Sequence, residues 1–222
     1  MRRGLFITFE GLDGSGKTTQ ITRLAAWLKK HGYSTVITRQ PGGTATGDRI
    51  RALVLDSHSK GLAPRCEMAL MFADRAQAIA EVIKPALAAG KIVLCDRFTD
   101  STEAYQGGGR GIPRATVVAL NRFATGGLKP DLTLFFDLPP EEGFRRLGRR
   151  PRRRLDRLEV ERAAFYRRVR RAYLDLAERE PGRVKRIAAL GTPEEVEARV
   201  VEVLEGFLRR RGFLRPRGGR AS

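Results

Sequence analysis

Residues 11–18 read GLDGSGKT, and this stretch guides the interpretation of the rest of the chain. It matches the pattern G-x-x-x-x-G-K-[ST] at every fixed position. The apolar residues 5–9 predict a buried strand before it, and apolar residues at helical spacing over 17–30 predict a helix after it. In such a unit, glycines let the backbone wrap a phosphate, and the helix directs the positive end of its dipole toward it. The sequence therefore predicts a loop that binds the phosphates of a nucleoside triphosphate.

The loop and its helix supply the predicted ATP contacts. These residues are Gly11, Leu12, Asp13, Gly14, Ser15, Gly16, Lys17, Thr18 and Thr19. Lys17 is expected to act catalytically by bridging the β- and γ-phosphates, and the Thr18 hydroxyl is expected to bind Mg²⁺. The loop does not identify the reaction, because motor ATPases, GTPases and small-molecule kinases share it.

Further apolar runs predict the remaining strands. They lie at residues 34–38, 91–96, 132–138 and 184–188. Helical patterns at residues 46–56, 65–88, 113–124, 156–179 and from 193 onward separate them. Strands that alternate with helices favour one parallel sheet with helices on both faces, so we expect an α/β fold. Residues 107–111 are rich in glycine and are expected to form a loop.

Composition limits the class of protein. A length of 222 residues suits one sizeable α/β domain, and 41% hydrophobic residues exclude a wholly disordered chain. No run approaches the roughly 20 apolar residues of a membrane span. Two cysteines, Cys66 and Cys95, cannot form a disulfide scaffold, which favours the reducing cytoplasm.

The net charge of +18 is concentrated in two segments. Residues 145–171 contain 13 arginines and three acids, and the chain after residue 205 contains six arginines and no acid. Such charge invites a nucleic-acid interpretation, but the remainder of the chain is nearly balanced. Within the first segment, an exposed helix face is predicted for Arg162, Arg167, Arg168, Arg170 and Arg171.

Asp96 and Arg97 end the strand at 91–96, which has the pattern of a central parallel strand. Ligands of open α/β sheets bind where such strands end. An acid there can hold Mg²⁺ through water, and an arginine can bind a second phosphate through bidentate hydrogen bonds from its guanidinium. Asp137, at the end of another strand, is an alternative for the metal-linked acid. Arg97 beside Asp96 favours Asp96.

Four segments resemble the thymidylate kinase family. They are residues 11–20 (GLDGSGKTTQ), 38–44 (TRQPGGT), 96–111 (DRFTDSTEAYQGGGRG) and 155–159 (LDRLE). The resemblance implies ATP-dependent phosphorylation of dTMP to dTDP with Mg²⁺, by a homodimer. It also implies the three-layer fold of nucleoside monophosphate kinases, with a five-stranded parallel sheet. Residues 1–213 would form one domain with an arginine-rich lid at about 146–156, followed by a basic tail at 214–222.

The resemblance also implies a dTMP site. Its residues would be Asp13, Arg39, Pro41, Met71, Phe72, Arg75, Arg97, Ser101, Tyr105 and Gln106. Arg97 would hold the dTMP phosphate, Asp13 would meet the sugar 3′-hydroxyl, and Arg75 would read the edge of thymine. Tyr105 would crowd a ribose 2′-hydroxyl. Asp13 and Arg97 join Lys17 as expected catalytic residues.

The chain departs from the family pattern at several positions. Gln40 stands where an acid is usual, and Ala188 replaces another acid. The aromatic residue that stacks on thymine usually lies four positions before Arg75, where this chain has Met71 with Phe72 beside it. One helical turn places Met71 and Arg75 on the same face, whereas Phe72 points about 100° away. Either residue could pack on the base, or both could fill the core.

The lid is expected to supply a catalytic arginine. Some thymidylate kinases carry an arginine in the phosphate loop, and others have a small residue there and an arginine in the lid. Gly14 occupies that loop position here, so the chain resembles the second kind. Among the lid arginines, Arg149 and Arg150 are the expected catalytic candidates.

Two other functions are also compatible with the sequence. Met71 and Gln40 leave room for another nucleoside or deoxynucleoside monophosphate kinase. The basic segments leave room for a nucleic-acid-binding ATPase, which is disfavoured because no aromatic residue lies among the arginines at 145–154.

Overall fold

Parallel strands form a single sheet among the described residues, in the order β2-β3-β1-β4-β5. The structure is a computed structural model that describes residues 3–56, 62–148 and 163–213. The strands are β1 (Phe6–Gly11), β2 (Thr35–Arg39), β3 (Ile92–Asp96), β4 (Leu132–Asp137) and β5 (Val184–Ala188). Each lies within two residues of a predicted run, and the parallel pairing confirms the predicted fold class.

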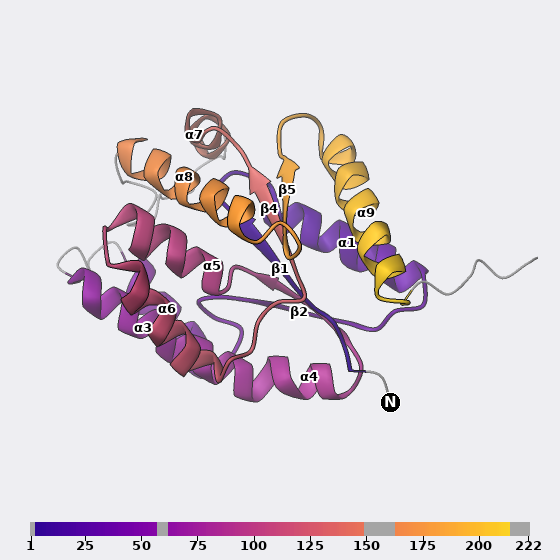
Figure 1. Cartoon of the computed structure of the whole chain (residues 1–222), viewed down its shortest axis with the longest axis horizontal. Coiled ribbons are helices and arrows are strands. Elements are labelled where there is room, and N and C mark those ends of the chain that lie inside the picture. Colours follow the sequence, from indigo (N-terminus) through magenta and orange to yellow (C-terminus); the bar gives the residue numbers. More distant parts are fainter. Residues whose placement is uncertain (1–2, 57–61, 149–162, 214–222) are drawn as a thin grey trace, which may run out of the picture.

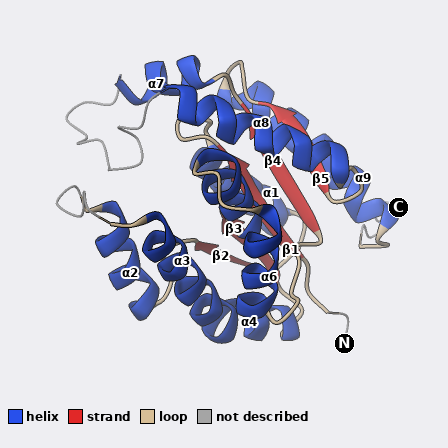
Figure 2. Ribbon diagram, turned by 60° about the vertical axis from the view of Figure 1, so that its left-hand side comes forward, coloured by secondary structure: helices blue, strands red, loops and turns tan. Residues whose placement is uncertain are grey.

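Helices cover both faces of this sheet (Figure 1, Figure 2). They are α1 (Lys17–Lys30), α2 (Ala45–Leu55), α3 (Pro64–Ala78), α4 (Lys84–Ala88), α5 (Thr99–Thr102), α6 (Arg114–Thr125), α7 (Pro140–Gly148), α8 (Ala163–Arg179) and α9 (Pro193–Arg210). Helices α1 and α9 pack side by side on one face. Helix α8 and the helical run from α3 to α4 cover the other.

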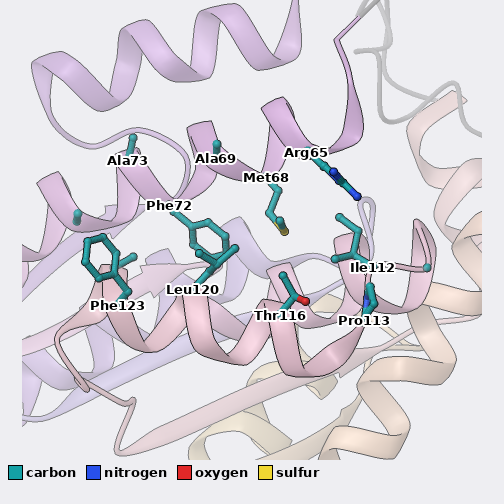
Figure 3. Close-up of a pocket in the computed structure, with 13 residues that line it drawn as sticks. Arg65, Met68, Ala69, Phe72, Ala73, Ile112, Pro113, Thr116, Leu120 and Phe123 are labelled. Carbon is teal, nitrogen blue, oxygen red and sulfur yellow. The ribbon is translucent and has the colours of Figure 1, made fainter.

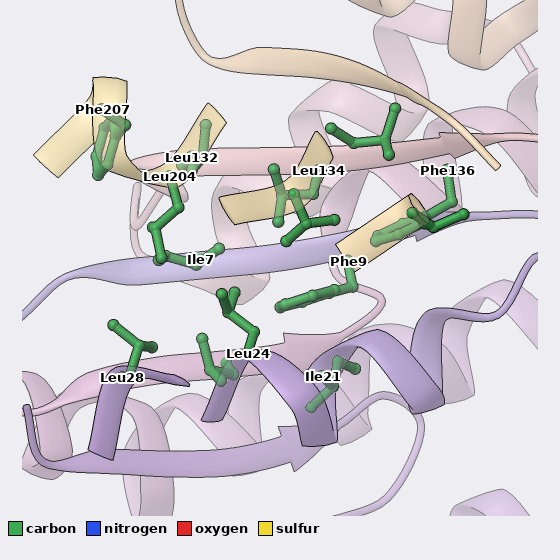
Figure 4. Close-up of a cluster of buried hydrophobic side chains, with 14 of the residues drawn as sticks. Ile7, Phe9, Ile21, Leu24, Leu28, Leu132, Leu134, Phe136, Leu204 and Phe207 are labelled. Atoms are coloured by element: carbon green, nitrogen blue, oxygen red, sulfur yellow. The ribbon is translucent and has the colours of Figure 1, made fainter. Parts of the chain in front are cut away.

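The side-chain alternation of β1 separates an apolar face from a polar one. Ile7 and Phe9 point toward α1 and α9, where they meet Leu24 and Leu204 in the largest apolar core (Figure 4). Thr8 and Glu10 point to the opposite face, as period-two geometry requires. Both are fully buried there, so the sheet carries polar groups beneath α8.

The strand register brings the expected functional residues to one edge. Asp96 lies opposite Phe9 of β1 and opposite Arg39 of β2. The phosphate loop continues directly from β1, so it leaves the sheet beside the end of β3. This edge therefore collects the loop, Asp96 and Arg97, as the sequence predicted.

The glycine-rich stretch is helical, and the predicted loop at 107–111 is wrong for most of its length. A π-helical segment, Glu103–Gly109, continues α5. A Cβ atom on Gly108 would lie 2.5 Å from the Cβ atom of Ala172, and one on Gly109 would lie 2.5 Å from the ring of Phe165. These glycines therefore permit close packing against α8. A second π-helical segment, Ile79–Ile83, joins α3 to α4 within the predicted helix at 65–88.

Candidate active site

The phosphate loop has the backbone that its glycines permit. Gly11, Gly14 and Gly16 have φ values of 134°, 81° and 89°, which side chains with a Cβ atom disfavour. Helix α1 begins at Lys17, whose ammonium donates hydrogen bonds to the carbonyls of Gly11 (3.1 Å) and Leu12 (2.9 Å). Burial, with the nearby charge of Arg97, lowers the pKa of Lys17 to about 8. The loop thus holds its lysine folded over the space that phosphates would enter.

Helix α7 packs directly against this loop through a pair of glycines. A Cβ atom on Gly14 would lie 2.7 Å from the carbonyl oxygen of Gly143, and one on Gly143 would lie 2.8 Å from that of Asp13. Arg146 of α7 donates to the carbonyls of Gly14 (3.4 Å) and Ala189 (3.1 Å). The approach of α7 therefore leaves no room for a side chain at position 14.

Gly14→Ala is expected to lower the free energy of unfolding more than Gly32→Ala. Both sites have a positive φ, which costs alanine about 1–2 kcal/mol. Only Gly14 adds a clash, because no atom lies within 4 Å of a Cβ on Gly32, and overpacking adds about 1–3 kcal/mol. Urea unfolding of both variants measures the difference. Equal losses would contradict the close approach of α7.

Thr18 and Asp96 form the best candidate for a metal site. The Thr18 hydroxyl lies 3.5 Å from one carboxylate oxygen of Asp96, and the other oxygen is buried without a partner. Among the described residues, no three histidine, cysteine or acidic side chains are grouped as metal ligands. A hydroxyl with one carboxylate fits Mg²⁺, which usually takes few protein ligands and completes its shell with phosphate oxygens and water.

Asp137, the alternative acid, is already engaged. Its carboxylate accepts hydrogen bonds from Arg170 Nε (2.7 Å) and Nη2 (3.1 Å), and from Arg186 Nε (2.8 Å). This pairing makes Asp137 a structural anchor for α8 and β5, and it favours Asp96 for the metal-linked role.

Arg97 lies at the centre of the site in an unusual backbone conformation. Its φ of 69° is the positive value of a non-glycine residue, which is typical of strained functional positions. Nη2 donates to Asp13 (2.6 Å) and Tyr105 Oη (3.2 Å), and Nη1 donates to Ser101 Oγ (3.2 Å). The guanidinium also lies 5.0 Å from the centre of the Tyr105 ring. Its fork is thus held toward the phosphate loop.

Two adjoining cavities meet at Arg97. The first, of about 220 Å³, is lined by six predicted ATP residues, Asp13, Gly14, Gly16, Lys17, Thr18 and Thr19, and also by Arg39 and Asp96. The second is lined by most of the predicted dTMP residues, namely Asp13, Pro41, Met71, Arg75, Arg97, Ser101, Tyr105 and Gln106. Asp13, Gln40, Arg51 and Arg97 line both cavities. A donor and an acceptor phosphate can therefore meet between these shared side chains.

The family model of thymidylate kinases matches residues 9–200. The chain belongs to the thymidylate kinase family. A thymidylate kinase of Desulfosudis oleivorans is 52% identical over 206 residues, which are 90% of this chain and 96% of that protein. One of Pseudomonas putida is 49% identical over 207 residues, covering 93% and 98% of the two chains. The crystal structure of thymidylate kinase from Ehrlichia chaffeensis matches with a TM-score of 0.73 and 36% identity, over 91% of this chain and 99% of that one.

Membership in the thymidylate kinase family confirms the predicted enzyme class, an ATP-dependent kinase that converts dTMP to dTDP. It favours this activity over the two alternatives left open by the sequence. Among the described residues, no helix has both the length and the apolar character that a membrane span requires.

Arg75 occupies the inner end of this thymidylate kinase's second cavity and is 2% exposed. Nε donates to Gln40 Oε1 (2.9 Å), Nη1 to Asn121 Oδ1 (2.7 Å), and Nη2 to the carbonyl of Phe98 (3.0 Å) and to Thr102 Oγ1 (3.0 Å). Burial lowers the pKa of Arg75 to about 10, so the guanidinium remains charged at neutral pH. Gln40, at the position where the resemblance leads one to expect an acid, thus holds Arg75 through a neutral oxygen.

Met71 and Phe72 lie on different sides of α3. Met71 lines the cavity beside Arg97, whereas Phe72 lines a separate apolar groove between α3 and α6. Gln106 lines the same cavity as Met71 and donates from Nε2 to the buried carboxylate of Glu67 (2.8 Å). The helical spacing of Met71 and Arg75 thus predicts the shared face correctly.

The arginines of α8 are mostly exposed but paired. Exposure is confirmed for Arg167, Arg168 and Arg171. The prediction is wrong for Arg170, which is half-buried because Asp137 holds it. Arg149 and Arg150, the candidate lid arginines, and Arg162 lie outside the described residues.

Several residues at this site were not predicted from the sequence. Arg51 lines both cavities and donates to the carbonyl of Pro41 (2.9 Å). It lies one turn after the buried Gly47, a spacing that could have placed it on the loop-facing side of α2. Arg146 and Gly143 contact the phosphate loop because helix α7 packs against it. No local pattern in the sequence predicts that packing.

Proposed function

We propose that this thymidylate kinase binds ATP on the phosphate loop and dTMP in the cavity lined by Met71 and Tyr105, and transfers the γ-phosphoryl group directly between them. The observation that carries this assignment is the pair of cavities that meet at Arg97. An in-line transfer needs the two phosphates to approach without a covalent enzyme intermediate, so positioning and charge stabilisation supply most of the rate.

The charged residues divide the work of this transfer. Arg97 holds the acceptor phosphate, and Lys17 stabilises the negative charge that spreads over the γ-phosphoryl oxygens. Thr18 and Asp96 would hold Mg²⁺, Asp96 through water; when bound, Mg²⁺ neutralises charge on the β- and γ-phosphates. Asp13 positions the acceptor sugar rather than acting as a strong base, because the attacking phosphate is already an anion.

A lid arginine completes the charge stabilisation. The contact between Gly14 and Gly143 supports this proposal, because the phosphate loop itself cannot carry an arginine at that position. We assign the role to Arg149 or Arg150.

Residues 1–213 form one domain with its lid at 146–156, and residues 214–222 form a basic tail. The enzyme acts in the cytoplasm.

Base recognition rests on the inner end of the dTMP cavity. Arg75 presents a buried positive charge that suits a base carbonyl, and Gln106 presents an amide anchored by Glu67. Met71 would pack on the face of thymine, since its flexible thioether adapts to an aromatic surface. Phe72 lines the groove on the other side of α3 and would act on the base only through Arg75, whose guanidinium carbon lies 5.7 Å from the centre of its ring.

A substrate panel tests the proposed activity. ADP release is measured with dTMP, dUMP, dCMP, dGMP and thymidine as acceptors, at equal concentrations of MgATP. We expect dTMP to give the highest kcat/KM. A higher value for another monophosphate would overturn the base assignment, and nucleic-acid-stimulated ATP hydrolysis without dTMP turnover would overturn the kinase assignment.

We further propose that the enzyme is a homodimer joined through α3 and α6. An apolar groove of about 900 Å³ runs between these helices, and Met68, Phe72, Leu120 and Phe123 line it (Figure 3). Phe123 is 86% exposed and Leu120 is 36% exposed, although both sit beside an apolar surface. The residues at the groove are nearly uncharged, so a second copy presenting the same apolar face would cover it well.

Phe123→Glu is expected to convert the dimer to a monomer. The substitution places a charge in the proposed interface, where its burial without a partner is unfavourable. Sedimentation equilibrium of the variant and the parent measures the mass. Ile37→Glu is the control, because Ile37 is also exposed, at 54%, but lies on the edge strand β2. A parent that sediments as a monomer would contradict the proposed dimer.

A further inference from the structure

Glu10 is a fully buried carboxylate outside the set of expected substrate contacts. It is 0% exposed and lies at the end of β1, one residue before the phosphate loop. Oε1 accepts a hydrogen bond from the backbone N–H of Phe98 (2.7 Å). Oε2 accepts hydrogen bonds from Ser101 Oγ (2.5 Å) and Tyr173 Oη (2.8 Å). The backbone N–H can only donate, and both hydroxyls donate to Glu10, so the carboxylate accepts all three bonds. Burial and the charge of Asp100 raise the pKa of Glu10, and the bonds from Ser101 and Tyr173 oppose that rise.

Each of these donors belongs to an element that frames Arg97. The N–H of Phe98 follows the residue whose φ is 69°, so its hydrogen bond to Glu10 fastens the strained turn from the side of β1. Ser101 donates to Glu10 and accepts from Arg97 Nη1 at 3.2 Å. The charge of Glu10 is thus linked to the guanidinium through one hydroxyl group.

We propose that Glu10 is a positioning residue, which orients the Arg97 guanidinium toward the acceptor phosphate by fixing the direction of the Ser101 hydroxyl. The proposal rests on the proposed function of Arg97 in holding that phosphate. It assigns to Ser101 a role in aligning Arg97, beside its place in the wall of the acceptor cavity.

Glu10→Gln tests the direction of this hydrogen bond while preserving the size of the side chain. The amide oxygen must accept from the N–H of Phe98, so the amide NH₂ faces Ser101 and Tyr173. Both hydroxyls then accept from the amide, and the hydrogen of Ser101 is left to the hydroxyl of Tyr173, which lies 2.9 Å from Ser101 Oγ. The Ser101 oxygen is then no longer polarised by a carboxylate, so its hydrogen bond to Nη1 weakens and the guanidinium is held less firmly.

The measured quantity is the ratio of the affinities for dTMP and thymidine, which isolates the contribution of the phosphate. Calorimetric titration is carried out with the full chain and with Glu10→Gln, Ser101→Ala, the double variant and Tyr173→Phe. We expect the ratio to fall about tenfold in Glu10→Gln, comparable to the loss of one charge-assisted hydrogen bond. The affinities for thymidine and ATP should stay within about threefold, because neither depends on this link.

The double variant distinguishes positioning from general damage. Ser101→Ala should lower the ratio in the parent but add much less in the Glu10→Gln background, because both changes weaken the same link. Tyr173→Phe removes a donor to Glu10 and a hydroxyl neighbour of Ser101, but it leaves the link from Glu10 through Ser101 to Arg97, so the ratio should be retained. An unchanged or increased ratio in Glu10→Gln, independent losses in the double variant, or an equal loss in Tyr173→Phe would each overturn the proposal. Arg97→Ala separates the two assignments: an unchanged ratio in that variant would refute the proposed role of Arg97 itself.

Discussion

Replacing Arg97 by alanine is expected to lower kcat/KM for dTMP about 1,000-fold, while the affinity for ATP changes by less than about threefold. The guanidinium lies where the two cavities meet, and its fork is held by Asp13, Ser101 and Tyr105. On the proposed assignment, removing it leaves the acceptor phosphate without its main cationic partner. The backbone strain at φ 69° is the same for alanine as for arginine, so the fold should tolerate the change.

Arg97→Lys is the matched control for this prediction. Lysine retains the charge but not the planar fork, so it should recover only part of the lost kcat/KM. Steady-state kinetics with varied dTMP and varied ATP separate the two substrates. Equal losses of kcat/KM for both would show that Arg97 does not act on the acceptor.

Replacing Lys17 by methionine is expected to lower kcat about 1,000-fold or more, because charge on the γ-phosphoryl group develops where the ammonium would act. The lysine is buried, and within residues 3–56, 62–148 and 163–213 its ammonium donates to the carbonyls of Gly11 and Leu12, so those bonds must be exchanged for phosphate contacts. Methionine preserves the apolar stem and the packing beneath the loop. Rapid-quench kinetics measures the chemical step directly; a rate within tenfold of the parent would contradict the assignment.

The pKa of Lys17 gives this prediction an independent signature. Burial lowers that pKa to about 8, so the ligand-free enzyme loses the positive charge as the pH rises through about 8. If Lys17 binds the ATP phosphates as proposed, its protonated form binds them more tightly, and the affinity for ATP should fall above this pH by up to about tenfold per pH unit. Lys17→Arg should remove the pH dependence. Titration of ATP binding between pH 7 and 9.5 measures both, and a flat profile for the parent would contradict the expected proton linkage.

The strands and the phosphate loop were predictable because their signals are local. Apolar runs of five or six residues and a complete GLDGSGKT motif define β1, the loop and α1 without reference to the rest of the fold. The shared face of Met71 and Arg75 follows from helical periodicity alone. These features depend on neighbours along the chain, which a sequence displays directly.

The remaining features depend on contacts between distant elements. The glycines at 107–109 have the appearance of a loop, but their missing side chains permit close packing on Phe165 and Ala172 of α8. Arg170 belongs to an arginine-rich helix, but Asp137 of β4 withdraws it from solvent. Glu10 is a charged residue near the end of a strand, a position where exposure would be expected. Three hydrogen-bond donors from other elements instead surround its carboxylate. None of these pairings is encoded by local spacing.

The contact between Gly14 and Gly143 also constrains how such an enzyme can evolve. A descendant that moved its catalytic arginine from the lid into the phosphate loop could not do so by one substitution, because the carbonyl of Gly143 lies where the new side chain would begin. Helix α7 would have to withdraw first, and its bonds from Arg146 to the loop would be lost with it. The intermediate would lack both the old support and the new cation. In this chain, placing an arginine at position 14 would therefore take at least two coordinated changes.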